Sequence, residues 1–199
     1  NHLFERTVEK TADQSHRTLI AVSLFKIQSG DDKAFIDDQQ WRNKYLTQLV
    51  ENLRWAQATN QRNVRIYTTR ECYETLAEEV ADLNTIGCLE IVVMKHDTVS
   101  SQPGMLWRFL SLQDTRYSIV HVCDIDENWL WTKKVSRILR KCDETVLSTL
   151  ESNDTPLDHL GEEYKGQVNR PLIIGSHVSV KPRVFADMNL EQVMLGFIE

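Results

Sequence analysis

The hydrophobic and polar positions divide the first half of the chain into strands and helices that alternate. Residues 18–27 form a nearly continuous apolar run, which is typical of a strand buried on both faces of a sheet. Between residues 39 and 58 the apolar positions recur every three or four residues, and this spacing indicates a long amphipathic helix. A second strand is predicted at residues 63–69. The chain therefore begins with the order strand, helix, strand.

The same order continues toward the middle of the sequence. Thr68 and Glu71 have the spacing of a capping box, so a second helix is expected to begin there with Thr68 as its cap. A third strand is predicted at residues 88–97, a third helix at residues 100–112 and a fourth strand at residues 117–124. The side chains expected to face inward from these two helices are Tyr73, Leu76, Ala77, Val80, Met105, Phe109 and Leu112.

Strands that alternate with helices are characteristic of parallel sheets, because the connection between two parallel strands crosses over the sheet and usually contains a helix. The expected fold class is therefore α/β, with a mostly parallel, Rossmann-like sheet and helices on both faces. Residues 1–17 are charged and aperiodic, and we interpret them as an N-terminal extension. Residues 18–199 are expected to form a single domain.

The pattern is weaker in the last third of the chain. A helix is predicted at residues 131–142, and residues 144–170 form a long polar stretch without clear periodicity. Strand character returns at residues 171–180. The chain closes with a predicted amphipathic helix whose apolar face contains Leu190, Val193, Met194 and Phe197.

Composition narrows the class of protein further. A chain of 199 residues with 41% hydrophobic and 26% charged content can bury a sizeable core. The net charge of -6 argues against nucleic acid as a partner, because phosphate binding needs clustered Lys and Arg. The apolar runs are shorter than the roughly 20 residues of a membrane helix, so we expect a cytoplasmic protein without a transmembrane segment. The 4 cysteines lack C-x-x-C spacing and are expected to be reduced and mostly buried.

Asp124 and Asp126 end the fourth predicted strand. Aspartate is favoured at turns and caps, which is one explanation of the pair. On an extended segment, however, residues two apart project to the same side, with about 7 Å between their α-carbons, so both carboxylates can approach one ion. A hard cation such as Mn²⁺ or Mg²⁺ takes oxygen ligands and relieves the repulsion between the two charges. In open α/β sheets ligands bind beyond the carboxyl ends of the strands, where this pair is expected.

The segment "MLWRFLSLQDTRYSIVHVCDIDEN", residues 105–128, resembles the central part of GT-A glycosyltransferases, in which an arginine-bearing helix leads into a strand that ends in a D-x-D motif. More loosely, the resemblance extends over residues 18–140. It implies a nucleotide-diphosphate-sugar donor, a metal ion held by Asp124 and Asp126, and transfer of the sugar to an unidentified glycan, lipid or protein acceptor. The glycogenin-like (family 8) retaining enzymes look nearest, because they also place an arginine about this far ahead of the motif.

The resemblance also implies roles for single residues. Arg108 matches the arginine that contacts the donor sugar or phosphates, although it could equally be a solvent-facing helix residue. Nucleotide contacts are expected at the ends of the first two strands and inside the motif, at Ser23, Phe25, Thr68 and Ile125. For Thr68, the capping role suggested by the sequence explains the residue as well.

One residue departs from the pattern of this family. Glycogenin-like enzymes add a late histidine as third metal ligand, and the late candidate here, His177, lacks the surroundings that the family has. His177 is therefore a third ligand, a group on the acceptor side, or a histidine of the core. The chain ends directly after a predicted amphipathic helix, which leaves open that a C-terminal portion with the third ligand or acceptor site is missing from it.

Two other functions are compatible with the sequence. A catalytically silent nucleotide-binding domain of the same fold would keep the pocket without the reaction. A haloacid-dehalogenase-like phosphatase also places D-x-D after an apolar strand and uses the first aspartate as nucleophile. Such phosphatases usually have Thr or Val where this chain has Asn128, which makes this alternative the weakest.

Overall fold

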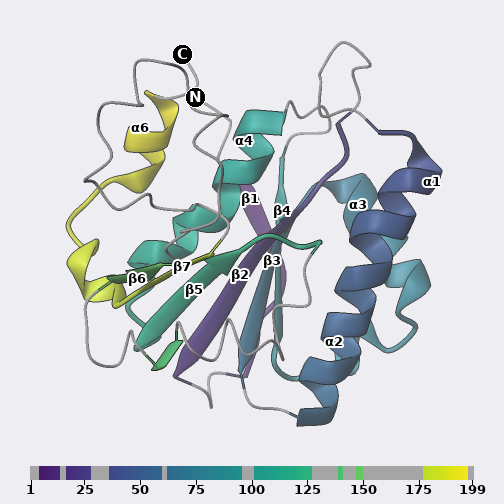
Figure 1. Ribbon diagram of the computed structural model, residues 1–199, viewed down its shortest axis with the longest axis horizontal. Coiled ribbons are helices and arrows are strands. Elements are labelled where there is room, and N and C mark those ends of the chain that lie inside the picture. The colour runs from purple at the N-terminus through teal and green to yellow at the C-terminus, as the bar shows by residue number, and fades with distance from the viewer. Residues whose placement is uncertain are drawn as a thin grey trace, which may run out of the picture.

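The structure, a computed structural model, describes residues 5–13, 17–27, 36–59, 62–95, 101–126, 139–140, 147–149 and 177–196. These residues form an α/β fold, as predicted, in which helices cover both faces of a seven-stranded sheet (Figure 1). Most of the helix predicted at 131–142 and most of the polar stretch at 144–170 lie outside the described residues. Among the described residues, none of the helices is long and apolar enough to cross a membrane.

The sheet is mixed rather than mostly parallel. Its strands are β1 (Arg6–Lys10), β2 (Thr18–Leu24), β3 (Asn63–Thr68), β4 (Leu89–Met94), β5 (Ile119–Cys123), β6 (Leu147–Thr149) and β7 (His177–Val180), in the spatial order β1-β4-β3-β2-β5-β7-β6. The four central strands, β4, β3, β2 and β5, are parallel to one another. The pairings of β1 with β4, β7 with β5, and β6 with β7 are antiparallel. The prediction of a parallel sheet therefore holds for its centre.

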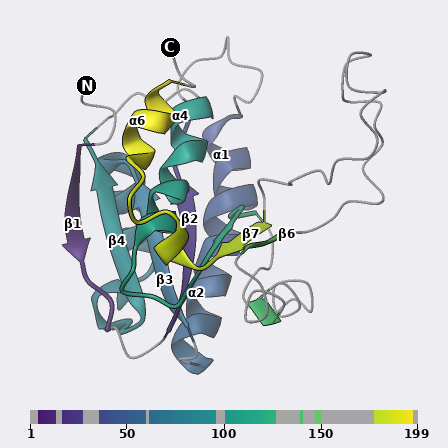
Figure 2. The same cartoon turned by 90° about the vertical axis from the view of Figure 1, so that its left-hand side faces the viewer.

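The two faces of the sheet carry separate hydrophobic cores. On one face pack α1 (Asp38–Trp41), η1 (Arg42–Leu46), α2 (Thr47–Thr59), α3 (Arg70–Glu79) and η2 (Leu83–Thr85). On the other face lie α4 (Ser101–Leu106), η3 (Trp107–Gln113), η6 (Pro182–Val184) and α6 (Leu190–Leu195). Alternate residues of β2 serve the two cores: Ile20 and Val22 face the first group, whereas Leu19 and Ala21 face the second. Figure 2 shows α4 and α6 together on one side of the sheet.

Residues 6–10, which we expected in an N-terminal extension, form the edge strand β1. Four of its five residues are exposed, so its sequence does not show the apolar run of a buried strand. The strand is attached through backbone pairing with β4 and through ion pairs such as Arg6–Glu191, at 3.2 Å. The extension thus contributes to the sheet.

Helix α3 begins one residue later than the sequence suggested. Its N-cap is Thr69, whose hydroxyl accepts a hydrogen bond from the backbone N–H of Cys72 at 3.3 Å. Thr68 is not the cap, because it still belongs to β3 and pairs in register with Leu24 of β2. The prediction for Thr68 was therefore wrong by one position.

Three side chains that we expected to face inward are exposed: Ala77, Met105 and Val193. Near Met105, the reason is a change of helix type, since α4 continues as the 3₁₀-helix η3. A 3₁₀-helix repeats every three residues, and the buried Trp107 and Leu110 have this spacing. The period of an ordinary α-helix therefore assigned Met105 to the wrong face.

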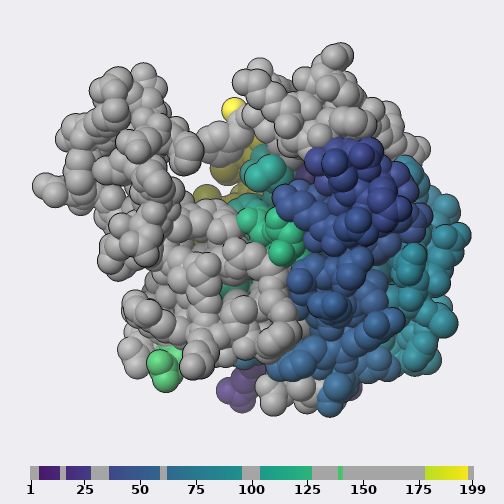
Figure 3. All heavy atoms as spheres, turned by 45° about the vertical axis from the view of Figure 1, so that its right-hand side comes forward, coloured from purple at the N-terminus to yellow at the C-terminus, as the bar shows by residue number. Residues whose placement is uncertain are grey.

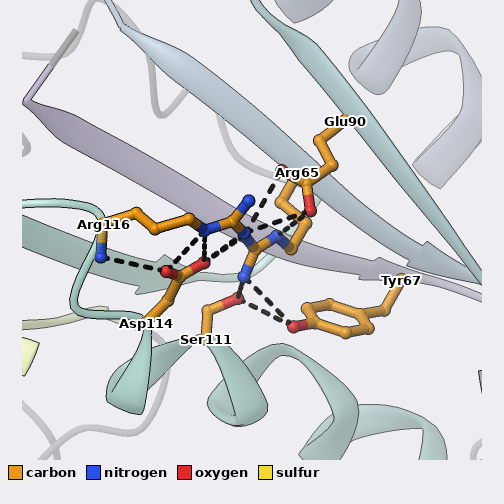
Figure 4. A network of polar contacts seen from close by, with 6 residues as sticks. All are labelled: Arg65, Tyr67, Glu90, Ser111, Asp114 and Arg116. Atoms are coloured by element: carbon orange, nitrogen blue, oxygen red, sulfur yellow. Dashed lines mark hydrogen bonds and ion pairs between the residues drawn. The ribbon is translucent and has the colours of Figure 1, made fainter. Parts of the chain in front are cut away.

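A buried polar network clamps η3 onto the sheet (Figure 4). Arg65 of β3, only 4% exposed, donates to the carboxylate of Glu90 at 3.0 Å and to the hydroxyl of Ser111 at 3.1 Å. It also forms an ion pair with Asp114, just after η3, and Asp114 pairs in turn with Arg116. Buried charges are tolerated when they are paired and hydrogen-bonded in this way. The network fixes the helix that carries Arg108.

Candidate functional site

The sheet reverses its strand order between β2 and β5. From β2 the chain continues to β3 and β4 on one side, and β5 is then added on the other side of β2. In open α/β sheets, ligands bind outside the carboxyl ends of the strands at such a switch point. A pocket with a cavity volume of ≈ 220 Å³ lies at this place, beyond Ser23 of β2 and Asp124 after β5.

The pocket brings together six of the eight residues that we predicted for the site. They are Ser23, Phe25, Arg108, Asp124, Ile125 and Asp126. Figure 3 shows the segment that ends β5, in green, at the surface beside α1, in dark blue. Of the remaining two predicted residues, Thr68 is not among the described residues that line the pocket, and the side chain of His177 lies outside what the structure describes.

One wall of the pocket is apolar and aromatic. It consists mainly of Phe25, Ile36, Trp41 and Tyr45. The indole N–H of Trp41 donates to the backbone carbonyl of Phe25 at 2.8 Å, which ties α1 to the end of β2. The ring of Phe25 packs edge-on against Trp107, with 5.9 Å between the ring centroids. This wall suits the flat face of an aromatic ring such as that of a nucleobase.

Lys26 holds the aromatic wall in position. Its ammonium group lies 2.7 Å from Asp38 in α1, 2.9 Å from Glu71 in α3 and 4.7 Å from the centroid of the Trp41 ring. Burial alone would lower the pKa of Lys26, but the hydrogen bonds from the amine to both carboxylates outweigh it and raise the pKa. Lys26 therefore stays charged and links the first turns of two helices.

Another part of the pocket lining is charged and contains Arg108, Asp124 and Asp126. Arg108 is 5% exposed, so the alternative that it faces solvent is wrong. Its backbone N–H donates to the hydroxyl of Ser23 at 3.2 Å. Its guanidinium donates to the backbone carbonyl of Cys123 at 3.0 Å and forms an ion pair with Asp124. Its Nε has no hydrogen-bond partner among the described residues, although it is buried.

Both aspartates of the D-x-D motif are paired with a cation. Asp124 contacts Arg108, and a carboxylate oxygen of Asp126 lies 3.3 Å from the ammonium group of Lys44. The two carboxylate side chains are 35% and 30% exposed, so solvent and ligands reach them from the pocket. The motif thus brings two negative charges to the pocket, and the protein balances both of them.

The donor set of the motif fits a hard divalent cation. Two accessible carboxylates at one end of a pocket supply the oxygen ligands that Mg²⁺ and Mn²⁺ prefer, and water or phosphate oxygens commonly complete such a site. Among the residues that the structure describes, there is no group of three or more His, Cys, Asp or Glu that could hold a metal ion. Asp124 and Asp126 are the described residues of the pocket that would hold such an ion.

His177 is the residue that the sequence offered as a third ligand. The structure describes its backbone, which stands opposite Cys123 in the antiparallel pairing of β7 with β5. This register places His177 beside the strand end that leads into Asp124. Its side chain lies outside what the structure describes, so the three interpretations of His177 stay predictions.

Thr68 is buried at the end of β3, and its hydroxyl donates to the backbone carbonyl of Thr69 at 3.3 Å. It is next to Leu24 in the sheet but is not among the residues that line the pocket. A direct contact of Thr68 with a nucleotide therefore stays a prediction, and its side chain already has a local role.

Sequence reasoning missed the residues that α1 and η1 contribute to the pocket. The apolar spacing between residues 39 and 58 predicts only a regular helix with Trp41 and Tyr45 in its buried stripe, and it gives no role to Lys44. The structure shows that residues 42–46 form a π-helical turn. Such turns are frequent at functional sites because they rotate the following side chains relative to a regular helix. The sequence of residues 42–46 contains no signal that distinguishes a π-helical turn from an α-helical one.

Comparison with known proteins gives no family for this chain, since neither a protein-family model nor a curated protein matches its sequence. The fold and the site therefore define the class: an α/β protein with a partly aromatic, partly charged pocket at the switch point of its sheet.

Proposed function

We propose that the protein is a metal-dependent glycosyltransferase of the GT-A type that uses a nucleotide-diphosphate-sugar donor. The observation that carries the proposal is the pocket at the switch point between β2 and β5, which unites Arg108 with both aspartates of the D-x-D motif. The finer description of the fold, a Rossmann-like GT-A sheet, belongs to the same proposal. It is supported by the four parallel central strands.

The two walls of the pocket match the two parts of such a donor. The nucleobase would lie against Phe25, Trp41 and Tyr45, where burial of its faces is favourable. The diphosphate would lie toward Arg108 and the motif. The unpartnered Nε of Arg108 is a donor that a phosphate oxygen could satisfy, with the strength of a charge-assisted hydrogen bond.

In this proposal the residues act mainly by positioning charge. A divalent cation bound to Asp124 and Asp126 would offset the negative charge of the leaving diphosphate. Arg108 contributes a fixed positive charge, since η3 and the bonds to Ser23 and Cys123 hold it in place before the donor binds. The acceptor, whether glycan, lipid or protein, would approach from the open side of the pocket.

The donor site can be tested by thermal shift with Mn²⁺ and nucleotide diphosphates. A ligand that binds the native state raises the melting temperature, so the parent should show a shift with Mn²⁺ and UDP or GDP together. Asp126→Ala should lose the part of the shift that depends on Mn²⁺. Asp82→Ala, which removes an exposed aspartate far along the chain from the motif, is the matched control and should keep it. A parent that shows no shift with any nucleotide diphosphate would refute the donor site.

A second candidate, a catalytically silent nucleotide-binding domain of the same fold, is favoured by one observation. Each motif aspartate is already paired with a cation of the protein, as expected where a diphosphate is bound without metal chemistry. Hydrolysis of a panel of nucleotide sugars separates the two candidates. Slow, Mn²⁺-dependent release of sugar supports the transferase, and binding without release supports the silent domain.

A phosphatase would need Asp124 as a free nucleophile, whereas Arg108 holds that carboxylate.

A further inference from the structure

We propose that Lys44 exchanges partners during donor binding: it pairs with Asp126 in the free protein and moves to the diphosphate when Asp126 becomes a metal ligand. The inference rests on the proposed function, because it concerns the same site. It assigns to Lys44, a residue outside the D-x-D motif, the coupling between metal binding and nucleotide binding.

The geometry places Lys44 between the motif and the aromatic wall. Its ammonium group lies 3.3 Å from Asp126 and 3.1 Å from the phenolic oxygen of Tyr45. Tyr45 and Asp126 both line the pocket, and the ammonium group of Lys44 is in contact with both of them. Lys44 is 54% exposed and has a long, flexible side chain, so it can turn from one partner to another without moving the backbone.

The charges at the motif explain why an exchange is needed. Asp124 with Arg108 and Asp126 with Lys44 form two pairs whose formal charges cancel. A divalent cation that approaches Asp126 therefore meets a lysine ammonium group beside its ligand and is repelled by it. Arg108 is buried and held by Ser23 and Cys123, whereas Lys44 is the cation that can leave.

The diphosphate supplies a new partner for Lys44. A nucleotide diphosphate brings negative charge to the end of the pocket where Asp126 lies, and a lysine released from Asp126 would be within reach of it. Metal and nucleotide should then bind cooperatively. A metal ion bound to Asp126 releases Lys44 for the diphosphate, and a bound diphosphate keeps the positive charge of Lys44 away from the metal ion. The helix turn that carries Lys44 is the π-helical η1, which directs this side chain toward the motif.

The test is Lys44→Met, measured in two binding experiments. Electron paramagnetic resonance of free Mn²⁺ gives the affinity for the metal alone, and calorimetry with UDP and GDP at saturating Mn²⁺ gives the affinity for the nucleotide. The variant should bind Mn²⁺ alone about fivefold more tightly, which is the size expected for the loss of one partly exposed ion pair. It should bind the nucleotide diphosphate about fivefold more weakly. Effects of opposite sign are the signature of the exchange.

Two control variants complete the design. Arg42→Met removes a positive charge from the same turn, but Arg42 pairs with Asp38 and Glu79 and should leave both affinities within about twofold. Lys44→Arg keeps the charge and should stay closer to the parent than Lys44→Met. If Lys44→Met changes both affinities in the same direction, or neither, the exchange is wrong while the donor site stands. If the parent binds neither UDP nor GDP, both proposals fail.

Discussion

Gly104 lies where helix α4 crosses the ring of Phe25, and this contact shapes the aromatic wall of the pocket. A Cβ added at Gly104 would stand 2.7 Å from ring carbons of Phe25, which is too close for carbon atoms that are not bonded to each other. The ring would have to move, and it is also held against Trp107. Glycine at this position therefore allows the helix and the pocket wall to lie in contact.

We predict that Gly104→Ala weakens nucleotide binding and destabilises the fold by about 1–3 kcal/mol, the usual cost of overpacking. The measurements are calorimetry with UDP and urea denaturation. Gly87→Ala is the matched control, because no atom lies within 4 Å of a Cβ at that position. Equal effects of the two substitutions would show that the contact with Phe25 is not what matters.

Single residues of the site differ in how far the sequence could predict them. Asp124 and Asp126 follow an apolar strand, and the carboxyl end of such a strand is a known position for ligands, so their place was predictable. The ion pair of Lys44 with Asp126 joins residues from distant parts of the chain. Arg108 was predicted as a site residue, but its burial depends on the packing of η3, which the sequence pattern does not describe.

At the level of elements, two substitutions test whether Thr69, rather than Thr68, is the N-cap of α3. Thr69→Val removes the cap of α3 and should lower the free energy of unfolding by about 1 kcal/mol. Thr68→Val makes a similar change of shape but leaves the cap intact and removes only the 3.3 Å hydrogen bond of the Thr68 hydroxyl to the Thr69 carbonyl, so it should cost less than Thr69→Val. Urea denaturation of both variants measures the difference. A larger loss for Thr68→Val would mean that the capping box predicted from the sequence is correct after all.

The sequence predicts where helices lie but not which type of helix each turn adopts. Helices at residues 39–58 and 100–112 were predicted from their apolar spacing and are present, but each contains a turn of another type. The π turn and the 3₁₀ turn keep the chain helical while changing which side chains face the pocket. Both turns contribute site residues, Lys44 and Arg108. The orientation of Lys44 and Arg108 therefore cannot be predicted from the period of about 3.6 residues that a regular α-helix has.

At the level of the whole molecule, the centre of the sheet was predictable and its edges were not. The central strands are buried on both faces, and burial requires the apolar runs that the sequence shows. The edge strand β1 is largely exposed, so its polar sequence resembles a loop. The switch point lies between two central strands, which is why the location of the pocket followed from the sequence while the mixed character of the sheet did not.

The polar network that clamps η3 to the sheet makes the stability of the whole fold depend on pH. Burial would raise the pKa of Asp114, but hydrogen bonds from Arg116 and Arg65 outweigh it and lower the pKa to about 2. The carboxyl group has an ordinary pKa of 3.8 when it is not so paired, so the unfolded chain binds its proton at higher pH than the native state does. The stabilisation is therefore fully present above about pH 5 and is lost as the pH falls toward 2.

We predict that Asp114→Asn lowers the free energy of unfolding by about 2 kcal/mol at pH 6 and by progressively less below pH 4. Urea denaturation of parent and variant at several pH values gives this difference directly, and contributions from other carboxyl groups cancel in it. Asp82→Asn removes an exposed aspartate and should show a small difference that does not change with pH. A difference for Asp114→Asn that is the same at pH 6 and pH 3 would mean that its carboxylate charge does not hold η3, and with it Arg108, on the sheet.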